Sequence, residues 1–500
     1  MQLLLNPLNT LKPLNHLNHL NHLMSNRASW SGSLAFVLAA AASAIGLGNL
    51  WRFPYLAAQY GGGMFIAVYL VLVVTLGFTL MVTEIAVGRK TQQSPLMAYS
   101  QISRRWGFIG VLGTLIPLFI VPYYCVIGGW VLYYLRAYAE MAFTGANIMG
   151  EAAANSGNVF GSFISAPFAP FGYGMLFILG CAAIISLGVK NGIEKSNLVM
   201  MPILFLMALG LSIYVVTLPG SMDGIKYYII PNLSCVSTPD GKFSYVLMAK
   251  TILGAAGQMF YSLSLAMGIM ITYGSYMKKG DSIERCVRRI EFFDTLIALI
   301  AGLMIIPVVY MFAVKTGTPV KEAMNAGPGL MFVTLPKVFA MFGPANAWIG
   351  FSFFLLVLFA AATSAISLFE ACVSSLCDYM KMDRKIATAF MTMTILFLSS
   401  FSAMGYGAWG HIKPFHMQFL DFFDFFTNSV MMPVVAIATC IFIGWFAGSK
   451  MVIDECEADG SKFRAKRIYS FMVKYLAPIL LVALLVSEVC RTLGIKGWSI

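Results

Sequence analysis

The chain is divided into apolar runs that are each long enough to cross a lipid bilayer, and this division limits what it can fold into. A membrane-spanning helix needs about 20 predominantly apolar residues. Runs of this length fold as helices because every backbone amide and carbonyl inside hydrocarbon must be hydrogen-bonded within the protein. The sequence therefore predicts an all-α integral membrane protein with about eleven transmembrane helices. The runs cover approximately residues 33–57, 64–87, 108–138, 170–189, 197–217, 245–277, 290–314, 347–376, 386–406, 418–446 and 469–489.

Charged residues are few, and they are placed between the apolar runs. Hydrophobic residues make up 59% of the 500-residue chain and charged residues only 11%, whereas soluble domains carry about 25% charged residues. The net charge of +12 does not indicate a nucleic-acid partner, because the basic residues occupy short gaps. Every even-numbered run is followed by a basic gap, while the gap 139–169 contains no lysine or arginine. The positive-inside rule then predicts a multi-pass protein of the cell inner membrane, with its N-terminus cytoplasmic and its C-terminus external.

The cysteines and the N-terminal segment do not indicate a metal or redox site. Nine cysteines are scattered without CxxC spacing, several of them inside apolar runs, so we interpret them as packing residues. Residues 1–26 contain a Leu-Asn-His repeat with no helical or strand period. This segment is interpreted as a disordered tail, or as sequence upstream of a true start at Met24. A histidine-rich metal tag is the weaker alternative.

The first apolar run contains a stretch that does not fit a simple membrane anchor. Gly46, Gly48, Asn49, Arg52 and Pro54 interrupt it. Each glycine weakens a helix by about 1 kcal/mol relative to alanine, and an unsatisfied backbone carbonyl in hydrocarbon costs several kcal/mol. A broken helix at membrane depth is tolerated where it lines a cavity or holds a ligand. On local sequence alone, a kinked helix that packs through small residues explains the stretch equally well.

The sixth run contains a second stretch of the same kind. Residues 258–268 place Tyr261, Ser262, Ser264 and Gly268 in the middle of the membrane, five helices after the first break. Interrupted helices at matching positions of two halves indicate an inverted-repeat transporter with its site near the bilayer midplane. The predicted divisions are a tail over 1–26, a first repeat over 27–217, a second repeat over 218–447, and a cytoplasmic loop with helix 11 over 448–500.

Several polar side chains lie inside later runs. Asp294 lies near the start of the seventh run, Thr363 and Ser364 in the middle of the eighth, and Asp421 and Asp424 at the start of the tenth. Ionisable groups at membrane depth are costly and mark functional sites by default. Structural explanations exist for some of them: a helical hydroxyl can bond the carbonyl one turn earlier, and Asp421 can be a solvated carboxylate at a helix start. Asp424, one turn deeper, is the stronger functional candidate.

The stretch from Gly46 to Pro54, followed by three glycines at 61–63, resembles the first-helix signature of the neurotransmitter:sodium symporter family. The bacterial amino-acid transporters related to the leucine transporter are the most similar members. Residues 258–268 and the pair Tyr123–Tyr124 match the same family, as do the polar positions of the eighth and tenth runs. The resemblance extends from Arg27 to about Arg491. It implies the leucine-transporter-like fold of two inverted five-helix repeats with unwound helices 1 and 6.

The resemblance also implies two sodium sites, because unwound backbone carbonyls and short polar side chains supply oxygen ligands for sodium without burying many charges. The first site would take Ala44, Asn49, Ser262 and Asp294. The second site would take Ala42, Ile45, Ala360, Thr363 and Ser364.

By the same resemblance the substrate binds between the two interruptions. Its carboxylate would meet the amides of residues 46–48, sodium and the Tyr124 hydroxyl, and carbonyls near Tyr261 and Ser264 would receive its amino group. Ser43 adds no charge where the animal amine carriers have an aspartate, which favours an amino acid over a monoamine. The side-chain pocket is apolar and includes the flexible Met267, so we expect a neutral aromatic or large aliphatic amino acid. The implied substrate residues are Ser43, Ala44, Gly46, Leu47, Gly48, Ile120, Tyr124, Phe260, Tyr261, Ser262, Ser264, Ala266, Met267, Ala365 and Leu368.

Asp294 is a departure from the family pattern. Animal members and the leucine transporter have an asparagine at this position. A carboxylate beside two sodium ions would supply the negative charge that chloride supplies in animal members, so chloride is not expected to be required. Proton antiport through this carboxylate is a weaker hypothesis.

Two gates are implied on either side of the site. Charge pairs near water are individually weak, about 1 kcal/mol or less, which suits contacts that must open. A helix-five segment from Gly192 to Pro202 is expected to unwind as a water path to the second sodium site. The outer gate would be a water-bridged pair of Arg52 and Asp424, lidded by Tyr124 and Tyr261. The inner gate would consist of Arg27, Trp30, Tyr276 and Asp378.

Other functions were weighed against this interpretation. An enzyme would need a nucleophile with a base or paired acids, and His411 and His416 have no such partners in the membrane. A channel would show pore-lining rings rather than two interruptions converging on one site. A non-transporting amino-acid sensor of the same fold is the serious alternative to a sodium-coupled symporter, because its binding residues would look identical.

Overall fold

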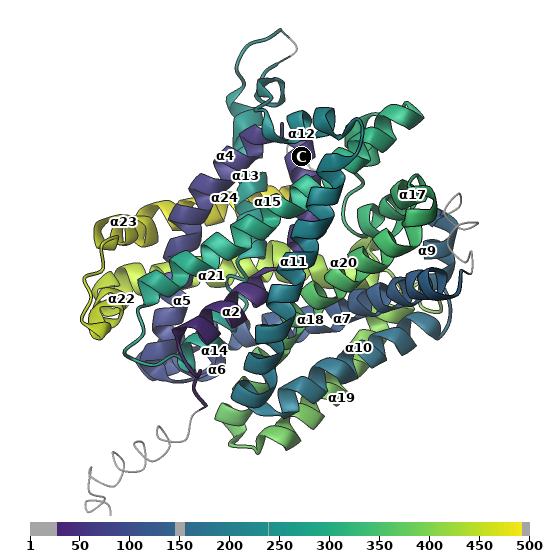
Figure 1. Cartoon of the computed structure of the whole chain (residues 1–500). Coiled ribbons are helices and arrows are strands. Elements are labelled where there is room, and N and C mark those ends of the chain that lie inside the picture. The colour runs from purple at the N-terminus through teal and green to yellow at the C-terminus, as the bar shows by residue number, and fades with distance from the viewer. Residues whose placement is uncertain (1–27, 146–155, 239, 493–500) are drawn as a thin grey trace, which may run out of the picture.

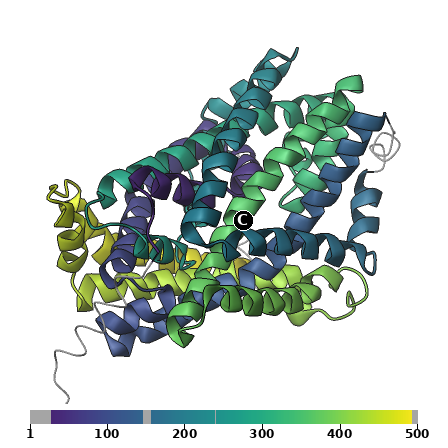
Figure 2. The same ribbon diagram turned by 60° about the horizontal axis from the view of Figure 1, so that its bottom comes forward.

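The structure is a computed structural model that describes residues 28–145, 156–238 and 240–492. Its helices pack into one bundle, with α22 (Ser449–Cys456) and α23 (Lys466–Phe471) at one end and α9 (Ser156–Ile164) at the other (Figures 1 and 2). The tail predicted over 1–26 lies outside the described residues. The prediction of an all-α membrane protein is confirmed.

Nine helices of the described segments are long and apolar enough to cross a membrane. Several contain a π-helical or 3-10 turn, marked η. These spans are α4–η2–α5 (Gly63–Thr91), η3–α7 (Arg104–Thr144), α10 (Ala169–Ser186), η4–α11 (Val189–Thr217), α15 (Ile283–Thr316), η7–α18 (Gly343–Met380), α19 (Arg384–Met404), α20–η9–α21–η10 (Phe419–Phe446) and α23–η12–α24 (Lys466–Thr492). The two other expected runs, 33–57 and 245–277, are each divided into shorter helices.

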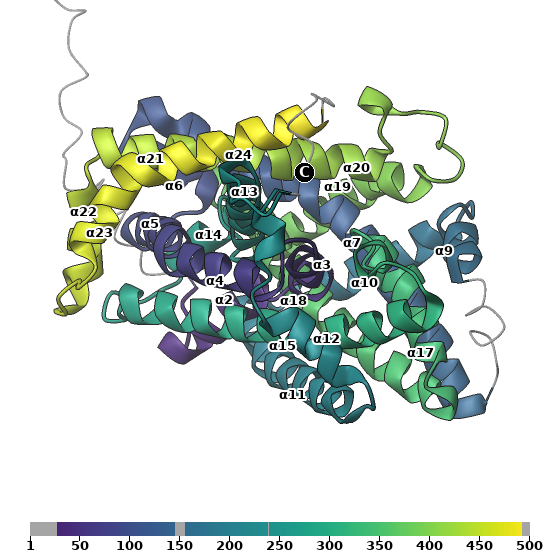
Figure 3. The same ribbon diagram turned by 90° about the horizontal axis from the view of Figure 1, so that it is seen from above.

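The first expected run is bent. Helix α2 (Ser33–Ala44) ends because Ile45 takes extended backbone angles, with φ −75° and ψ 92°. The chain resumes as the π-helical turn η1 (Gly48–Arg52) and α3 (Phe53–Gln59), and the two halves are bent by 54°. Pro54 is tolerated because it stands in the first turn of α3, where its missing amide is not needed. Both halves lie in the interior of the bundle (Figure 3).

The second divided run consists of α13 (Tyr245–Ser262) and α14 (Ile269–Ser275). Between them Ser264, Ala266 and Gly268 have positive φ angles of 53°, 58° and 72°. The left-handed conformation costs a non-glycine residue roughly 1–2 kcal/mol, so contacts must hold the other two in place. The Ser264 hydroxyl donates to the Ser43 carbonyl at 3.2 Å, and the Ala266 amide donates to Glu84 Oε1 at 2.6 Å. The buried Glu84 of α5 (Phe78–Thr91) therefore stabilises the interruption, although the sequence did not single it out.

Helix α14 is held against α5 by close backbone packing. A Cβ atom on Gly88 would lie 2.0 Å from the Ile271 carbonyl oxygen, and a Cβ on Gly274 would lie 2.6 Å from that of Ile85. Small residues let helices approach closely inside a membrane. This packing fixes α14, the helix that follows the second interruption, against α5.

The helix-five segment from Gly192 to Pro202, which was expected to unwind, is helical in this structure. Residues 189–217 form one continuous helical span in which Gly192 lies in η4 (Val189–Glu194) and Pro202 lies inside α11 (Lys195–Thr217). Gly192 is packed against the preceding helix, because a Cβ there would lie 1.9 Å from the Ile184 carbonyl oxygen. The segment is thus wound in this structure.

Candidate functional site

A cavity of about 360 Å³ lies where the two interruptions face each other. All residues that were expected to contact the substrate line it except Phe260, Ala266 and Ala365. Phe260 lines a separate outer cavity, Ala266 contributes its backbone amide to Glu84, and Ala365 is fully buried. The full lining is Ser43, Ala44, Gly46, Leu47, Gly48, Asn49, Ile120, Tyr124, Tyr261, Ser262, Ser264, Met267, Ile269, Ser364 and Leu368. Ile269 is the one lining residue that the sequence did not predict.

Asp294 holds two other residues of the first proposed sodium site, Asn49 and Ser262, by hydrogen bonds. Its Oδ1 accepts hydrogen bonds from Asn49 Nδ2 at 2.8 Å and from the Ser262 hydroxyl at 3.0 Å. Its Oδ2 accepts from the Tyr69 hydroxyl at 3.3 Å. Asn49 Oδ1 in turn accepts from the Gly46 amide at 3.2 Å. The carboxylate is fully buried, so these donors replace the water that its charge would otherwise need. Tyr69, from α4 (Gly63–Leu72), was missed because a tyrosine inside an apolar run gives no distinct signal.

Hydroxyls of α18 (Asn346–Met380) meet the broken end of α2 at the second proposed sodium site. The Ser364 hydroxyl donates to the carbonyl of Ser43 at 2.9 Å and to that of Ile45 at 3.5 Å. The Thr363 hydroxyl bonds the Ala360 carbonyl of the preceding turn at 3.1 Å, which is the structural explanation weighed from the sequence. Ala42 is buried in the last turn of α2. These oxygen atoms are neutral, as expected of a site for a weakly binding hard cation.

Glycine is needed at positions 46 and 48 because other side chains approach the backbone there too closely to leave room for a Cβ atom. A Cβ on Gly46 would lie 2.8 Å from Ser364 Oγ and 3.1 Å from the Tyr124 hydroxyl oxygen. A Cβ on Gly48 would lie 2.6 Å from the Tyr261 ring. The Leu47 amide between them donates to the Tyr124 hydroxyl at 3.4 Å. The backbone of residues 46–48 and this hydroxyl supply polar lining to the cavity, whereas Ile120, Met267 and Leu368 supply apolar lining.

Arg52, Asp424 and Tyr261 of the expected outer gate line a second cavity of about 1250 Å³, whereas Tyr124 lines the first. Arg52 donates to the Gly257 carbonyl at 3.1 Å and lies 5.8 Å from the centre of the Tyr261 ring. Asp424 accepts from the Tyr123 hydroxyl at 3.1 Å and from Asn428 Nδ2 at 2.6 Å. Both charged groups therefore face one cavity, and each is held by neutral partners.

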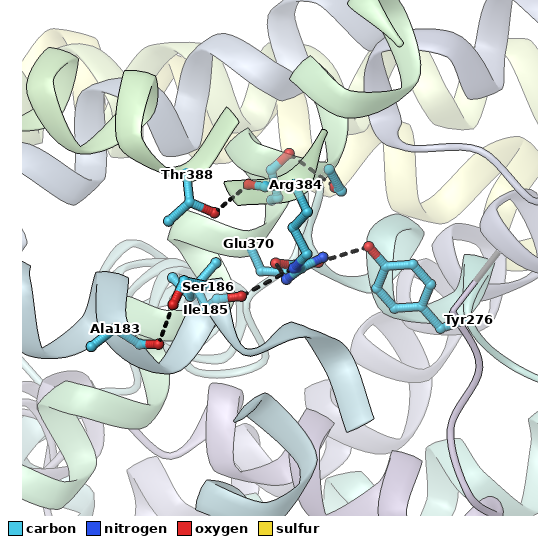
Figure 4. Close-up of polar contacts among 9 residues, drawn as sticks. Ala183, Ile185, Ser186, Tyr276, Glu370, Arg384 and Thr388 are labelled. Atoms are coloured by element: carbon cyan, nitrogen blue, oxygen red, sulfur yellow. Dashed lines mark hydrogen bonds and ion pairs between the residues drawn. The ribbon is translucent and has the colours of Figure 1, made fainter. Parts of the chain in front are cut away.

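A buried polar network lies next to the residues expected at the inner gate. Tyr276 donates to Glu370 at 2.7 Å, and Glu370 forms a buried ion pair with Arg384, which also donates to the Ile185 carbonyl at 3.0 Å (Figure 4). This network links α14, α18, α19 and α10. Glu370 is fully buried and was not predicted, because a single acidic residue inside an apolar run does not reveal its partner.

Two of the expected inner-gate residues lie together: the Trp30 amide donates to the Tyr276 carbonyl at 3.2 Å, and the centres of their rings are 6.1 Å apart. Trp30 is buried and donates its indole N–H to the Tyr273 carbonyl at 3.0 Å. Asp378 accepts a hydrogen bond from the Ser94 amide at 2.6 Å. Arg27, the expected partner of Asp378, lies outside the described residues.

Comparison with known proteins decides the family. Residues 27–148 and 173–498 match the sodium:neurotransmitter symporter family. The chain belongs to this family. It is 31% identical to the sodium-dependent transporter YhdH of Bacillus subtilis over 457 residues, which cover 91% of this chain and 96% of YhdH. It is 26% identical to the human sodium- and chloride-dependent GABA transporter 2 over 495 residues, or 91% of this chain and 79% of the relative.

A solved structure supports the same family assignment. The crystal structure of MhsT in complex with L-phenylalanine matches with a TM-score of 0.79 and 31% sequence identity, covering 93% of this chain and 100% of the MhsT chain. The prediction of a leucine-transporter-like helical fold is thereby confirmed. Membership in the sodium:neurotransmitter symporter family also confirms that the protein is a sodium-dependent membrane transporter and not an enzyme.

Proposed function

We propose that the protein is a symporter that couples sodium entry to the import of a neutral hydrophobic L-amino acid by alternating access. The observation that carries the proposal is the convergence of both helix interruptions and Ser364 on one cavity, whose lining residues Asn49 and Ser262 both bond Asp294. Sodium dependence is supported by the relatives, and an amino-acid substrate by MhsT, whose structure contains L-phenylalanine.

The first sodium ion is proposed to bind between Asn49, Ser262, Asp294 and the Ala44 carbonyl. Asp294 now accepts hydrogen bonds from both side chains. A sodium ion would turn the amide oxygen of Asn49 and the hydroxyl oxygen of Ser262 toward itself, while the Tyr69 hydroxyl keeps its bond to Asp294. Because the carboxylate balances one of two cations, chloride is not required.

The second sodium ion is proposed to bind between α2 and α18. Its ligands would be the carbonyls of Ala42, Ile45 and Ala360 and the hydroxyls of Thr363 and Ser364. Every ligand is neutral, so this ion is held by dipoles alone and is the more readily released of the two. Its release would free the inner end of α2 from α18.

The substrate is proposed to lie with its carboxylate at the amides of Gly46 to Gly48 and the Tyr124 hydroxyl. Its amino group would be received by carbonyls of the Leu263–Gly268 interruption. The side chain would then point toward Ile120, Met267 and Leu368, where no charged group is present to pair with a charged side chain. This favours an aromatic or large aliphatic amino acid.

Uptake into proteoliposomes tests the proposal. Labelled phenylalanine, tryptophan, tyrosine and leucine should accumulate only under an inward sodium gradient, and unlabelled charged amino acids should not compete. Uptake should be unchanged when gluconate replaces chloride. Accumulation without a sodium gradient would contradict the coupling, and sodium-dependent binding without accumulation would support an amino-acid sensor of the same fold instead.

A further inference from the structure

A groove of about 730 Å³ lies between α15 and the outer surface of α4 and η2 (Val73–Gly77), away from the proposed substrate cavity. In Figures 1 and 3, α15 crosses the span formed by α4, η2 and α5. Leu70 and Val74 line one wall, and Phe292, Leu296 and Leu299 line the other. Leu70, Val74 and Phe292 are exposed at the surface of the bundle, so in a membrane the groove faces lipid.

One end of the groove is basic. Arg285, Arg288 and Arg289 are exposed on the face of α15 that continues into Phe292 and Leu296, because residues three and four apart share a helix face. Arg285 and Arg289 form no ion pair with any described residue. The positive-inside rule assigns this end of α15 to the cytoplasmic side.

Arg288 is held so that its guanidinium has free donors. Its Nη1 donates to the Val74 carbonyl and to Glu291 Oε2, each at 3.4 Å, and its carbon lies 3.7 Å from the centre of the Phe78 ring. These contacts orient the planar group while Nε and Nη2 have no hydrogen-bond partner among residues that the structure describes. The arginine side chain is 43% exposed. A fixed guanidinium with a free N–H edge is suited to a phosphate oxygen pair.

The charges of this region do not cancel. Glu291 offsets one of the three arginines, and its other oxygen is buried without a hydrogen-bond partner. Glu284, on the same helix, offsets a second arginine and also accepts a hydrogen bond from the Arg464 backbone amide at 3.1 Å. The basic end therefore keeps a net positive charge directly beside an apolar groove.

We propose that this groove binds an anionic phospholipid of the cytoplasmic leaflet. Its phosphate would lie against Arg288 between Arg285 and Arg289, and one acyl chain would follow Phe292, Leu296 and Leu299. Basic pockets between transmembrane helices on the cytoplasmic side bind anionic headgroups in this way. A zwitterionic lipid has no net charge to balance the arginines, and a headgroup without chains leaves the groove unfilled.

Native mass spectrometry of the full chain tests this site. Protein released from nanodiscs of equal parts dioleoylphosphatidylglycerol and dioleoylphosphatidylcholine should retain phosphatidylglycerol at least about tenfold in preference to phosphatidylcholine. Soluble glycerophosphoglycerol, which carries the headgroup alone, should not displace the retained lipid. Equal retention of both lipids, or displacement by the headgroup alone, would overturn the proposal. These measurements use the unaltered protein, so they do not depend on whether a variant folds.

Variants then locate the site. Arg288→Gln removes the oriented guanidinium, and Leu296→Trp fills the groove without changing charge. Both should reduce phosphatidylglycerol retention about tenfold. Arg105→Gln, at another exposed arginine in the 3-10 turn η3 (Arg104–Trp106), is the matched control and should retain the lipid as the unaltered protein does. Unchanged retention in both groove variants would place the lipid elsewhere and refute the assignment.

Discussion

Asn49 Nδ2 and Asp294 Oδ1 are joined by a hydrogen bond of 2.8 Å that ties the first helix interruption to α15. The bond is fully buried, and the other face of Asn49 accepts from the Gly46 amide. The side chain of Asn49 thus transmits the position of the Asp294 carboxylate to the backbone at which the substrate carboxylate is proposed to bind. Sodium and substrate would be coupled through a single amide group.

Replacing Asp294 by asparagine should make transport depend on chloride. The substitution removes the negative charge beside the two proposed sodium ions, and a bound anion then has to compensate for it. Uptake of labelled phenylalanine by Asp294→Asn should be at least about fivefold faster in chloride than in gluconate, whereas the unaltered protein should show no difference. Asp223→Asn, at an exposed ion pair with Lys226, is the control. Equal uptake by Asp294→Asn in both salts would contradict the role given to this charge.

Replacing Ser364 by alanine should weaken sodium binding. The variant loses one proposed ligand of the second ion and the hydroxyl that bonds the Ser43 carbonyl at 2.9 Å. A lost ligand of about 1.4 kcal/mol corresponds to a tenfold change, so half-maximal uptake should need about ten times more sodium. A sodium titration measures this change. Ser400→Ala, whose hydroxyl only bonds the Phe397 carbonyl of its own helix, should leave the titration unaltered.

Replacing Gly48 by alanine should weaken substrate binding while leaving the protein folded. The new methyl group would lie 2.6 Å from the Tyr261 ring, which lines the cavity and must move. The displaced ring narrows the cavity, so the affinity for phenylalanine should fall at least about tenfold in a binding assay. Gly113→Ala in α7 (Gly107–Thr144) meets no atom within 4 Å and should bind phenylalanine normally. Normal affinity in Gly48→Ala would mean that the ring position does not define the pocket.

The two helix interruptions could be predicted more fully than the side chains that contact them. Glycines and polar residues inside apolar runs are conspicuous because they conflict with a plain membrane helix, so both interruptions could be predicted from the residues, while most of the cavity lining was implied by the family resemblance. Tyr69, Glu84 and Glu370 were missed because each is a single residue whose meaning depends on a partner distant in the chain. Glu84 accepts a hydrogen bond from the Ala266 amide. The sequence around Ala266 does not indicate that its backbone is left-handed.

Tertiary contacts also decided which charges pair. Sequence reasoning paired Arg52 with Asp424 through water, and the structure places both on one cavity with separate neutral partners. On the inner side Tyr276 also donates to Glu370, an acceptor that the sequence did not reveal. Charge pairing depends on side-chain reach and on the tilt of helices, neither of which is encoded by helical periodicity.

The ion pair of Glu370 with Arg384 should stabilise the packing of α18 against α19. Replacing Glu370 by glutamine leaves the guanidinium in a largely buried position without its counter-charge, and breaking a buried pair costs about 3 kcal/mol or more. The variant should therefore unfold at lower temperature, and the amides of α14 should exchange hydrogen faster because Tyr276 then donates to a neutral amide oxygen, a weaker acceptor than the carboxylate. Arg136→Gln, at the exposed pair with Glu140, should change stability by less than about 1 kcal/mol. The double variant Glu370→Gln, Arg384→Gln should recover part of the loss, because it removes the unpaired charge. If the hydrogen exchange of the α14 amides were unchanged in Glu370→Gln, the network would have no part in holding α14 in place.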